Sequence, residues 1–72
     1  MGHRNIDRLA RVTWLLAHQD QWEGMASAAD PRRETIIKAM QAAGLFSVNT
    51  RWQDVRLMNF INAARKQRRS AA

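Results

Sequence analysis

The stretch "DPRRETIIKAMQAAGLF", residues 30–46, contains signals for both the start and the end of one helix. Asp30 suits the N-cap, and Pro31 suits the first helical position, where a missing backbone N–H costs nothing. Gly44 suits the residue just past the end, with Leu45 packing back on the last turn. The spacing predicts a buried face of Ile36, Ile37, Ala39, Met40 and Ala43, and an exposed face of Glu34, Thr35, Lys38, Gln41 and Ala42, with Glu34 and Lys38 paired.

Two further helices are predicted on either side of this one. The first runs from about Asn5 to His18, and its expected core face is Ile6, Leu9, Ala10, Val12, Thr13, Leu16 and Ala17. The last begins at Thr50, which forms a capping-box pattern with Gln53, and it runs to about Lys66. Its expected core face is Leu57, Phe60, Ile61 and Ala64, extended by Val55 and Met58.

Two shorter segments join these helices. A short helix is expected from about Gln21 to Ala28, although Gly24 costs about 1 kcal/mol in a helix interior. Its expected buried side is Trp22, Met25, Ala26 and Ala29. The connector "LFSVNT", residues 45–50, is expected to place Leu45, Phe46 and Val48 against the core.

Together these elements predict an all-α domain of three or four helices. The 72 residues form a single domain, with order expected over about residues 5–66 and a basic tail over 67–72. A chain of this size buries only about 60% of its unfolded surface, so its stability is marginal. It has no cysteine and hence no disulfide, which leaves dimerisation or partner binding as the expected support.

Positive charge is concentrated in the last third of the chain. Residues 49–72 hold five arginines and one lysine against one aspartate, which is +5 of the net +6. Such a field attracts polyanions, so the partner is expected to be a nucleic acid or an acidic surface. A membrane is not expected, because no large apolar side chains interleave with the terminal charges.

Residues 22–41, "WEGMASAADPRRETIIKAMQ", resemble the helix-turn-helix of small DNA-binding proteins. Ala26 falls at the small position of the first helix and Ile36 at the apolar position of the second. Where the motif has a turn glycine this chain has Asp30 followed by proline, so either the turn is a variant or the helices are related differently. The whole chain, small and rich in Arg and Ala, is also similar to short DNA-binding and host-interaction proteins of bacteriophages.

The resemblance implies that the second helix enters the major groove of DNA. The residues expected to contact DNA there are Arg32, Arg33, Thr35, Lys38 and Gln41. The clustered cations Arg65, Lys66, Arg68 and Arg69 are expected to hold phosphate groups without reading sequence. The alternatives are a plain capped helix with a solvated arginine pair, and a solvated basic helix end.

A second surface is predicted around Trp52. Trp and Arg are enriched at interface hot spots, and Trp52, Val55, Arg56 and Asn59 are expected to form an interface with a second copy or a host protein. The alternative is that Trp52 only covers the connector at residues 45–48. On the docking interpretation, the chain is an adaptor or inhibitor.

Enzymatic chemistry is not expected. The six acids are scattered, His18 is interpreted as an exposed helix-end residue, and there is no phosphate-binding glycine loop. Two histidines without cysteine match no zinc-site spacing, so no metal, cofactor or small-molecule substrate is expected. No apolar run spans a membrane, and a cytoplasmic location is expected. The predicted function is therefore non-enzymatic binding of double-stranded DNA, as a transcription regulator or accessory factor.

Overall fold

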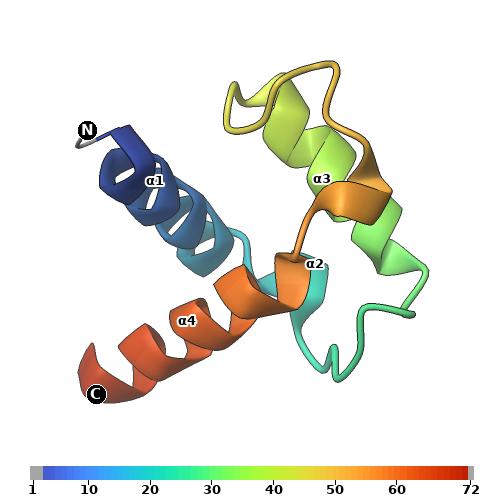
Figure 1. The fold of residues 1–72 in the computed structure, drawn as a ribbon. Helices are drawn as coiled ribbons and strands as arrows, with labels where there is room; N and C mark the ends of the chain where they lie inside the picture. Colours follow the sequence, from blue (N-terminus) through green and yellow to red (C-terminus); the bar gives the residue numbers. More distant parts are fainter. Residues whose placement is uncertain (1–2, 72) are drawn as a thin grey trace.

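The computed structural model describes residues 3–71, with side chains described over residues 7–70. Its elements are α1 (His3–Ala17), α2 (Gln19–Trp22), α3 (Arg32–Ala42), the 3-10 helix η1 (Trp52–Asp54) and α4 (Leu57–Ala71). No strand occurs in this range, so the predicted all-α class is confirmed. α1 and α4 converge on α2, while α3 and η1 form the other half of a flat molecule of 36 × 33 × 17 Å (Figure 1).

Trp22 is the largest fully buried side chain. Its indole Nε1 donates a hydrogen bond to the carbonyl oxygen of Leu15 at 2.7 Å, so the one polar atom of the ring is satisfied. The buried cluster draws on all four α-helices and consists of Val12, Leu15, Trp22, Met25, Ile36, Ile37, Met40, Val55, Leu57, Ile61 and Ala64. Trp22 thus sits in the single core that joins the two halves.

α1 buries a different face from the predicted one. Of the expected core residues, Val12 is buried, Ala10 and Leu16 are half-buried, and Leu9, Thr13 and Ala17 are exposed, while Ile6 lies outside the described side chains. Leu15, which the predicted stripe excludes, is fully buried in the cluster with Trp22. The helix has apolar residues on two sides, and it packs on α4 and Trp22 through the Val12–Leu15 side.

α3 has the predicted start and end. Pro31 has helical dihedral angles, and the carboxylate of Asp30 accepts a hydrogen bond from the backbone N–H two residues on, at 2.9 Å. Gly44 adopts the left-handed conformation with φ +78°, and the N–H of Leu45 donates to the carbonyl oxygen of Met40 at 2.9 Å. Asp30 and Gly44 thus make the predicted contacts at the two ends, while the helix itself begins at Arg32, one residue after the predicted Pro31.

The two faces of α3 also follow the prediction at most positions. Ile36, Ile37 and Met40 are buried, Ala39 is half-buried, and Ala43 is exposed. On the outer side, Lys38 Nζ lies 3.2 Å from the Glu34 carboxylate, as expected for this spacing. Ala43 is exposed because it lies beyond the last helical residue, where the chain turns toward Gly44.

The helix predicted over Gln21–Ala28 is wrong. α2 ends at Trp22, because Gly24 takes φ +80° and turns the chain out of the helix. Residues 23–31 then cross to α3 without helical structure. Trp22 and Met25 are buried as expected, whereas Ala26 and Ala29 are exposed.

The capping box predicted at Thr50 is also wrong. Residues 51–56 instead form η1 flanked by extended backbone, and α4 begins at Leu57. Gln41 of α3 explains the difference, because its Nε2 donates to the carbonyl oxygens of Ser47 (3.0 Å) and Thr50 (2.9 Å) and so fixes a turn there. Val48 in this turn is 84% exposed and does not enter the core, contrary to expectation.

α4 buries Leu57, Ile61 and Ala64 as predicted, with Met58 and Phe60 half-buried. It continues to Ala71, past the predicted end near Lys66. None of the helices described over residues 3–71 combines the length and apolarity needed to cross a bilayer.

Candidate nucleic-acid interface

Arg33 holds η1 against the start of α3. Its Nη2 donates to the carbonyl oxygens of Trp52 (3.0 Å), Gln53 (3.3 Å) and Val55 (3.2 Å), and its guanidinium lies 5.2 Å from the Trp52 ring centroid. Its Nη1 reaches the carbonyl oxygen of Ala28 at 3.4 Å. The side chain predicted to contact DNA bases is therefore engaged in bonds within the chain.

The other predicted groove residues on α3 fall into two kinds. Gln41 is half-buried, and its amide is bound to the turn at residues 47–50. Thr35 and Lys38 are exposed on the outer side, three residues apart along one side of the helix. Of these three residues, only Thr35 and Lys38 have the exposure that a base contact would need.

Arg32 points away from its neighbour Arg33, toward the turn after α2. Its Nε and Nη2 donate to the two carboxylate oxygens of Asp30 at 3.1 and 3.0 Å, and its Nη1 donates to the carbonyl oxygen of Glu23 at 2.9 Å. Hydrogen bonds from the Arg32 side chain, and then from its backbone N–H, lower the pKa of Asp30. The bonds to Asp30 likewise raise the pKa of Arg32.

Two arginines of α4 meet the same turn from the other side. Nη1 of Arg68 donates to the Glu23 carboxylate at 3.2 Å and to Gln19 Oε1 at 2.6 Å, and Nη2 of Arg65 donates to the carbonyl oxygen of Met25. Both guanidinium groups also lie over the Trp22 ring, at 5.5 Å for Arg65 and 5.3 Å for Arg68. Arg32, Arg65 and Arg68, separated in sequence, therefore converge on residues 23–25.

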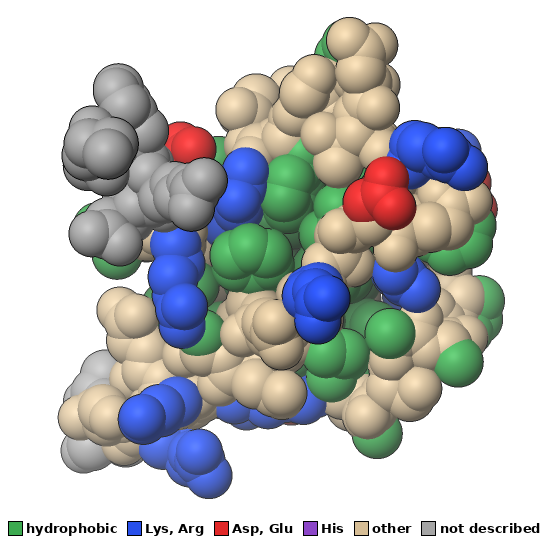
Figure 2. All heavy atoms as spheres, viewed as in Figure 1, with side chains coloured by type: hydrophobic (Ala, Val, Ile, Leu, Met, Phe, Trp, Pro, Cys, Tyr) green, Lys and Arg blue, Asp and Glu red, His purple; other side chains and the backbone are tan. Residues whose placement is uncertain are grey.

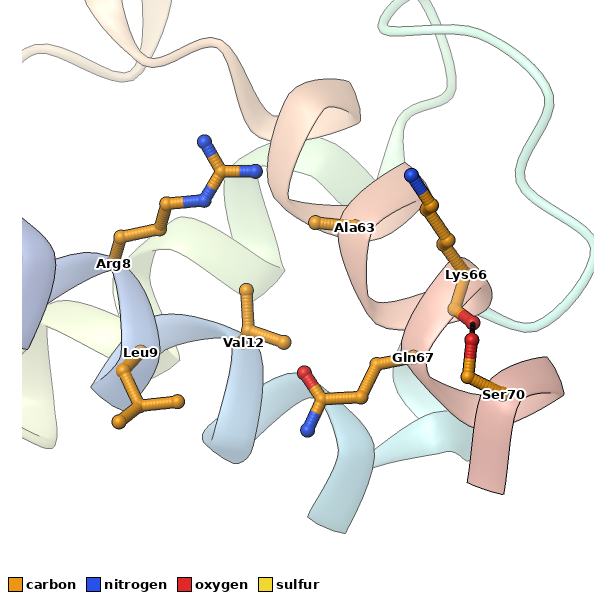
Figure 3. A pocket seen from close by; sticks show the side chains of 7 residues that line it. All are labelled: Arg8, Leu9, Val12, Ala63, Lys66, Gln67 and Ser70. Atoms are coloured by element: carbon orange, nitrogen blue, oxygen red, sulfur yellow. Dashed lines mark hydrogen bonds between the residues drawn. The ribbon is translucent and has the colours of Figure 1, made fainter. Parts of the chain in front are cut away.

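Lys66 and Arg69 complete this region on the outside of α4. Both are exposed, and neither side chain has a hydrogen bond or an ion pair among the described side chains of residues 7–70. Arg8 of α1 lines a hollow with Lys66, and the two side chains rise on opposite sides of it, over Ala63 (Figure 3). Sequence reasoning missed Arg8, because no local signal indicates which α1 residue faces α4.

We call this set of cations the basic end; it consists of Arg8, Arg32, Arg65, Lys66, Arg68 and Arg69. The acids in contact with it are Glu23 and Asp30. Lys and Arg side chains gather over the C-terminal half of α4 at the lower left, where this view displays no acidic side chain (Figure 2). The positive charge therefore follows the C-terminal half of α4, with Arg8 beside Lys66 and with Arg32 and Arg68 both at Glu23.

Comparison with known proteins identifies no relative that would indicate the role of this site. No family model, curated protein or solved structure matches the chain. Over the described residues, no three His, Cys, Asp or Glu side chains gather as a metal site requires. The chemistry of the site therefore has to be argued from the geometry of the basic end.

The four residues predicted as an interface do not form one exposed patch. Val55 is only 6% exposed, so its assignment to an interface is wrong; it is buried because it enters the core beside Leu57. Arg56 and Asn59 are exposed, and Trp52, which is 37% exposed, lies beside Arg33. Docking through Trp52 stays a prediction.

His18 is half-buried, contrary to the expectation of an exposed helix-end residue. Its ring stacks on Trp14 with 4.0 Å between centroids and 15° between planes. Its Nδ1 donates to the carbonyl oxygen of Trp14 at 2.7 Å, which satisfies an acceptor in the last turn of α1. This contact makes His18 a helix cap.

Proposed function

We propose that this chain binds double-stranded DNA without enzymatic activity, through contacts between the basic end and phosphate groups. The observation that carries the proposal is the run of four cations on α4, which Arg8 joins at the hollow beside Lys66 and Arg32 joins at Glu23, against two carboxylates. Duplex DNA presents two rows of closely spaced phosphates, so a cluster of this kind releases several counterions on binding. This release supplies the affinity.

The arginines that are bonded within the chain remain suited to phosphate. The Arg32 and Arg68 side chains are 41% and 38% exposed, and a guanidinium group has five N–H donors, of which internal bonds occupy only some. Their orientation is already fixed by Asp30 and Glu23, so little side-chain entropy is lost on binding. Lys66 and Arg69 add two cations that bond to none of the side chains described over residues 7–70.

Phosphate contacts position a protein but do not select a sequence. The proposed role is accordingly that of an accessory DNA-binding factor or regulator whose affinity is largely sequence-independent. Thr35 and Lys38 on α3 are the candidates for base contacts, because they are exposed on a helix that begins beside the basic end.

Fluorescence anisotropy of the full chain with a short labelled duplex tests the proposal. Six phosphate contacts predict that affinity falls about a thousandfold between about 50 and 200 mM salt, with a linear relation between the logarithms. The absence of binding at the lower salt concentration would contradict the proposal. Similar affinity for two unrelated duplex sequences is also expected.

A further inference from the structure

A hollow lies between α1, the connector after α3, and the start of α4. Its volume is about 460 Å³, within the range of about 300–1,000 Å³ typical of ligand sites. The rings of Phe46 and Phe60 form part of its wall, and Thr50 and Asn59 add polar groups. The centre of Figure 2, between α1 and η1, shows hydrophobic side chains bordered by Lys and Arg side chains. The hollow therefore offers both aromatic surface and hydrogen-bonding groups.

The two rings of the hollow are packed together with Arg11 of α1. Their centroids are 6.1 Å apart with 69° between planes, and the Arg11 guanidinium lies 4.2 Å from the Phe46 centroid and 5.5 Å from the Phe60 centroid. Nε of Arg11 donates to the carbonyl oxygen of Leu45 at 2.9 Å, which holds the guanidinium in place. Aromatic rings and guanidinium planes are the groups on which proteins stack unpaired bases.

Arginines also give the hollow an excess of positive charge. Arg8, Arg11 and Arg56 line it against one acid, Asp54, so three positive charges and one negative charge leave +2. None of the three arginines makes an ion pair among the described side chains of residues 7–70. Asp7, the sequence neighbour of Arg8, is exposed and does not line the hollow. A ligand that combines a flat ring with an anionic group suits both parts of the hollow.

We propose that this hollow binds an unpaired nucleotide of a DNA strand whose neighbouring phosphates lie on the basic end. The base stacks on the surface formed by Arg11 and the two phenylalanine rings, and the adjacent phosphates meet Arg8 and Arg56. Arg8 lines both this hollow and the one beside Lys66, so the strand that supplies the base leads to the basic end. The inference rests on the proposed function for the phosphate contacts and adds a base to them.

The mixed chemistry of the hollow selects a nucleotide over simpler ligands. An inorganic anion would leave the two rings uncovered, and an apolar ligand would cover charged guanidinium groups without pairing them, which is costly. The exposed amide of Asn59 has both a donor and an acceptor for the edge of a base. Every base has a face that stacks, so the preference is for an unpaired nucleotide and not for a sequence.

Three labelled DNA hairpins with the same stem test the inference by fluorescence anisotropy. The first is fully paired, the second carries one unpaired thymidine, and the third has an abasic residue at that position. The second and third have the same phosphates, so stacking of the base predicts at least about fivefold tighter binding of the second. Equal affinity for these two would overturn the inference and leave the proposed function intact. Failure of the fully paired hairpin to bind at low salt would instead contradict the proposed function.

Two variants locate the base in the hollow. Phe46→Leu keeps an apolar side chain but removes the ring beside Arg11, and Asn59→Ala removes an exposed amide. Each should reduce the preference for thymidine over the abasic residue at least twofold and leave binding of the fully paired hairpin unchanged, since neither residue belongs to the basic end. Asn49→Ala, an exposed asparagine outside the hollow, is the control and should keep the full preference.

An unchanged preference in Phe46→Leu, or in Asn59→Ala if the first variant does not fold, would overturn the inference. Competition with free thymidine monophosphate distinguishes a nucleotide within a strand from a free one. The monophosphate should displace the thymidine hairpin only at concentrations at least about a hundredfold above those of the unlabelled hairpin, because it lacks the neighbouring phosphates. Displacement at equal concentrations would identify a free nucleotide as the ligand and would overturn the inference.

Discussion

The surroundings of Arg33 and the basic end are both rich in arginine, but they use it differently. Arg33 donates to three backbone carbonyl groups of residues 52–55 and to one at Ala28. At the basic end, Lys66 and Arg69 make no hydrogen bond or ion pair with the side chains described over residues 7–70, and Arg32 and Arg68 remain half-exposed. Non-helical residues leave carbonyl groups that need donors. Arg32 and Arg65 each donate to one such group, at Glu23 and Met25, whereas Arg33 donates to four, so the difference lies in how much of the side chain is engaged. Neighbouring arginines, 32 and 33, thus serve different purposes.

Replacing Arg33 should have the largest effect on stability. Arg33→Met keeps much of the side-chain volume but removes every hydrogen bond to η1, and bonds from charged groups contribute about 1.5–3 kcal/mol each. Because these bonds share one half-buried side chain, we expect a loss of about 2–3 kcal/mol in the free energy of unfolding. Urea denaturation measures it. A loss below about 0.5 kcal/mol would mean that Arg33 is not a structural residue.

Removing the outer cations of the basic end should weaken DNA binding and leave the stability of the fold nearly unchanged. The double variant Lys66→Gln and Arg69→Gln should bind DNA at least about tenfold more weakly at 0.1 M salt, because two counterions fewer are released. Its unfolding free energy should stay within about 0.5 kcal/mol of wild type, since both side chains are exposed. The matched control is Arg51→Gln, an exposed cation beside η1, which should leave DNA affinity close to wild type.

Glu23→Gln should strengthen DNA binding a few-fold. It removes the carboxylate that partly neutralises Arg68, while an amide oxygen still accepts the hydrogen bond from Nη1. Asp54→Asn removes the same charge from η1, outside the basic end, and should change affinity less. Anisotropy titrations at one salt concentration compare the three proteins. An unchanged affinity for Glu23→Gln would argue against Arg68 as a phosphate ligand.

The smallest effect is expected on stability when the pH is lowered, through the protonation of Asp30. Hydrogen bonds from Arg32 lower the pKa of Asp30 in the folded chain, so the ionised carboxylate stabilises the fold. This stabilisation is present above the pKa of an unfolded aspartate and is lost as the pH falls through the lowered folded-state pKa. Asp30→Asn should therefore be less stable than wild type near neutral pH and should approach it in acid. Thermal unfolding across the acidic range measures the difference, and a constant difference would rule out this titration.

Local signals determined α3 more completely than any other element. Asp30, Pro31 and Gly44 each have one strongly preferred backbone role, so the start and end could be predicted from a few residues. No comparable local signal determines which face of α1 is buried. Periodicity identifies an apolar stripe but does not indicate which other helix will pack against it. Leu15 is buried because Trp22 and α4 lie on its side, and this depends on the whole fold.

The candidate site shows the same limit. The cluster at Arg65–Arg69 is visible in the sequence because its charges are contiguous, but Arg8 and Arg32 join it only through tertiary structure. The inward bonds of Arg33 could not be predicted either, since they depend on carbonyl groups about twenty residues away. Charge alone therefore predicts a polyanionic partner but not which cations remain available to it.

The central claim is that Arg33 stabilises the fold while the basic end binds DNA. The salt dependence of DNA binding by three proteins tests this claim most directly. The measurement compares wild type, Arg33→Met and the Lys66→Gln, Arg69→Gln double variant under conditions where all three are folded. We predict that the slope of log affinity against log salt is the same for wild type and Arg33→Met. The double variant should show a slope smaller by about 1.8, at about 0.9 for each lost phosphate contact. An unchanged slope in the double variant, or an equal reduction in Arg33→Met, would contradict the account.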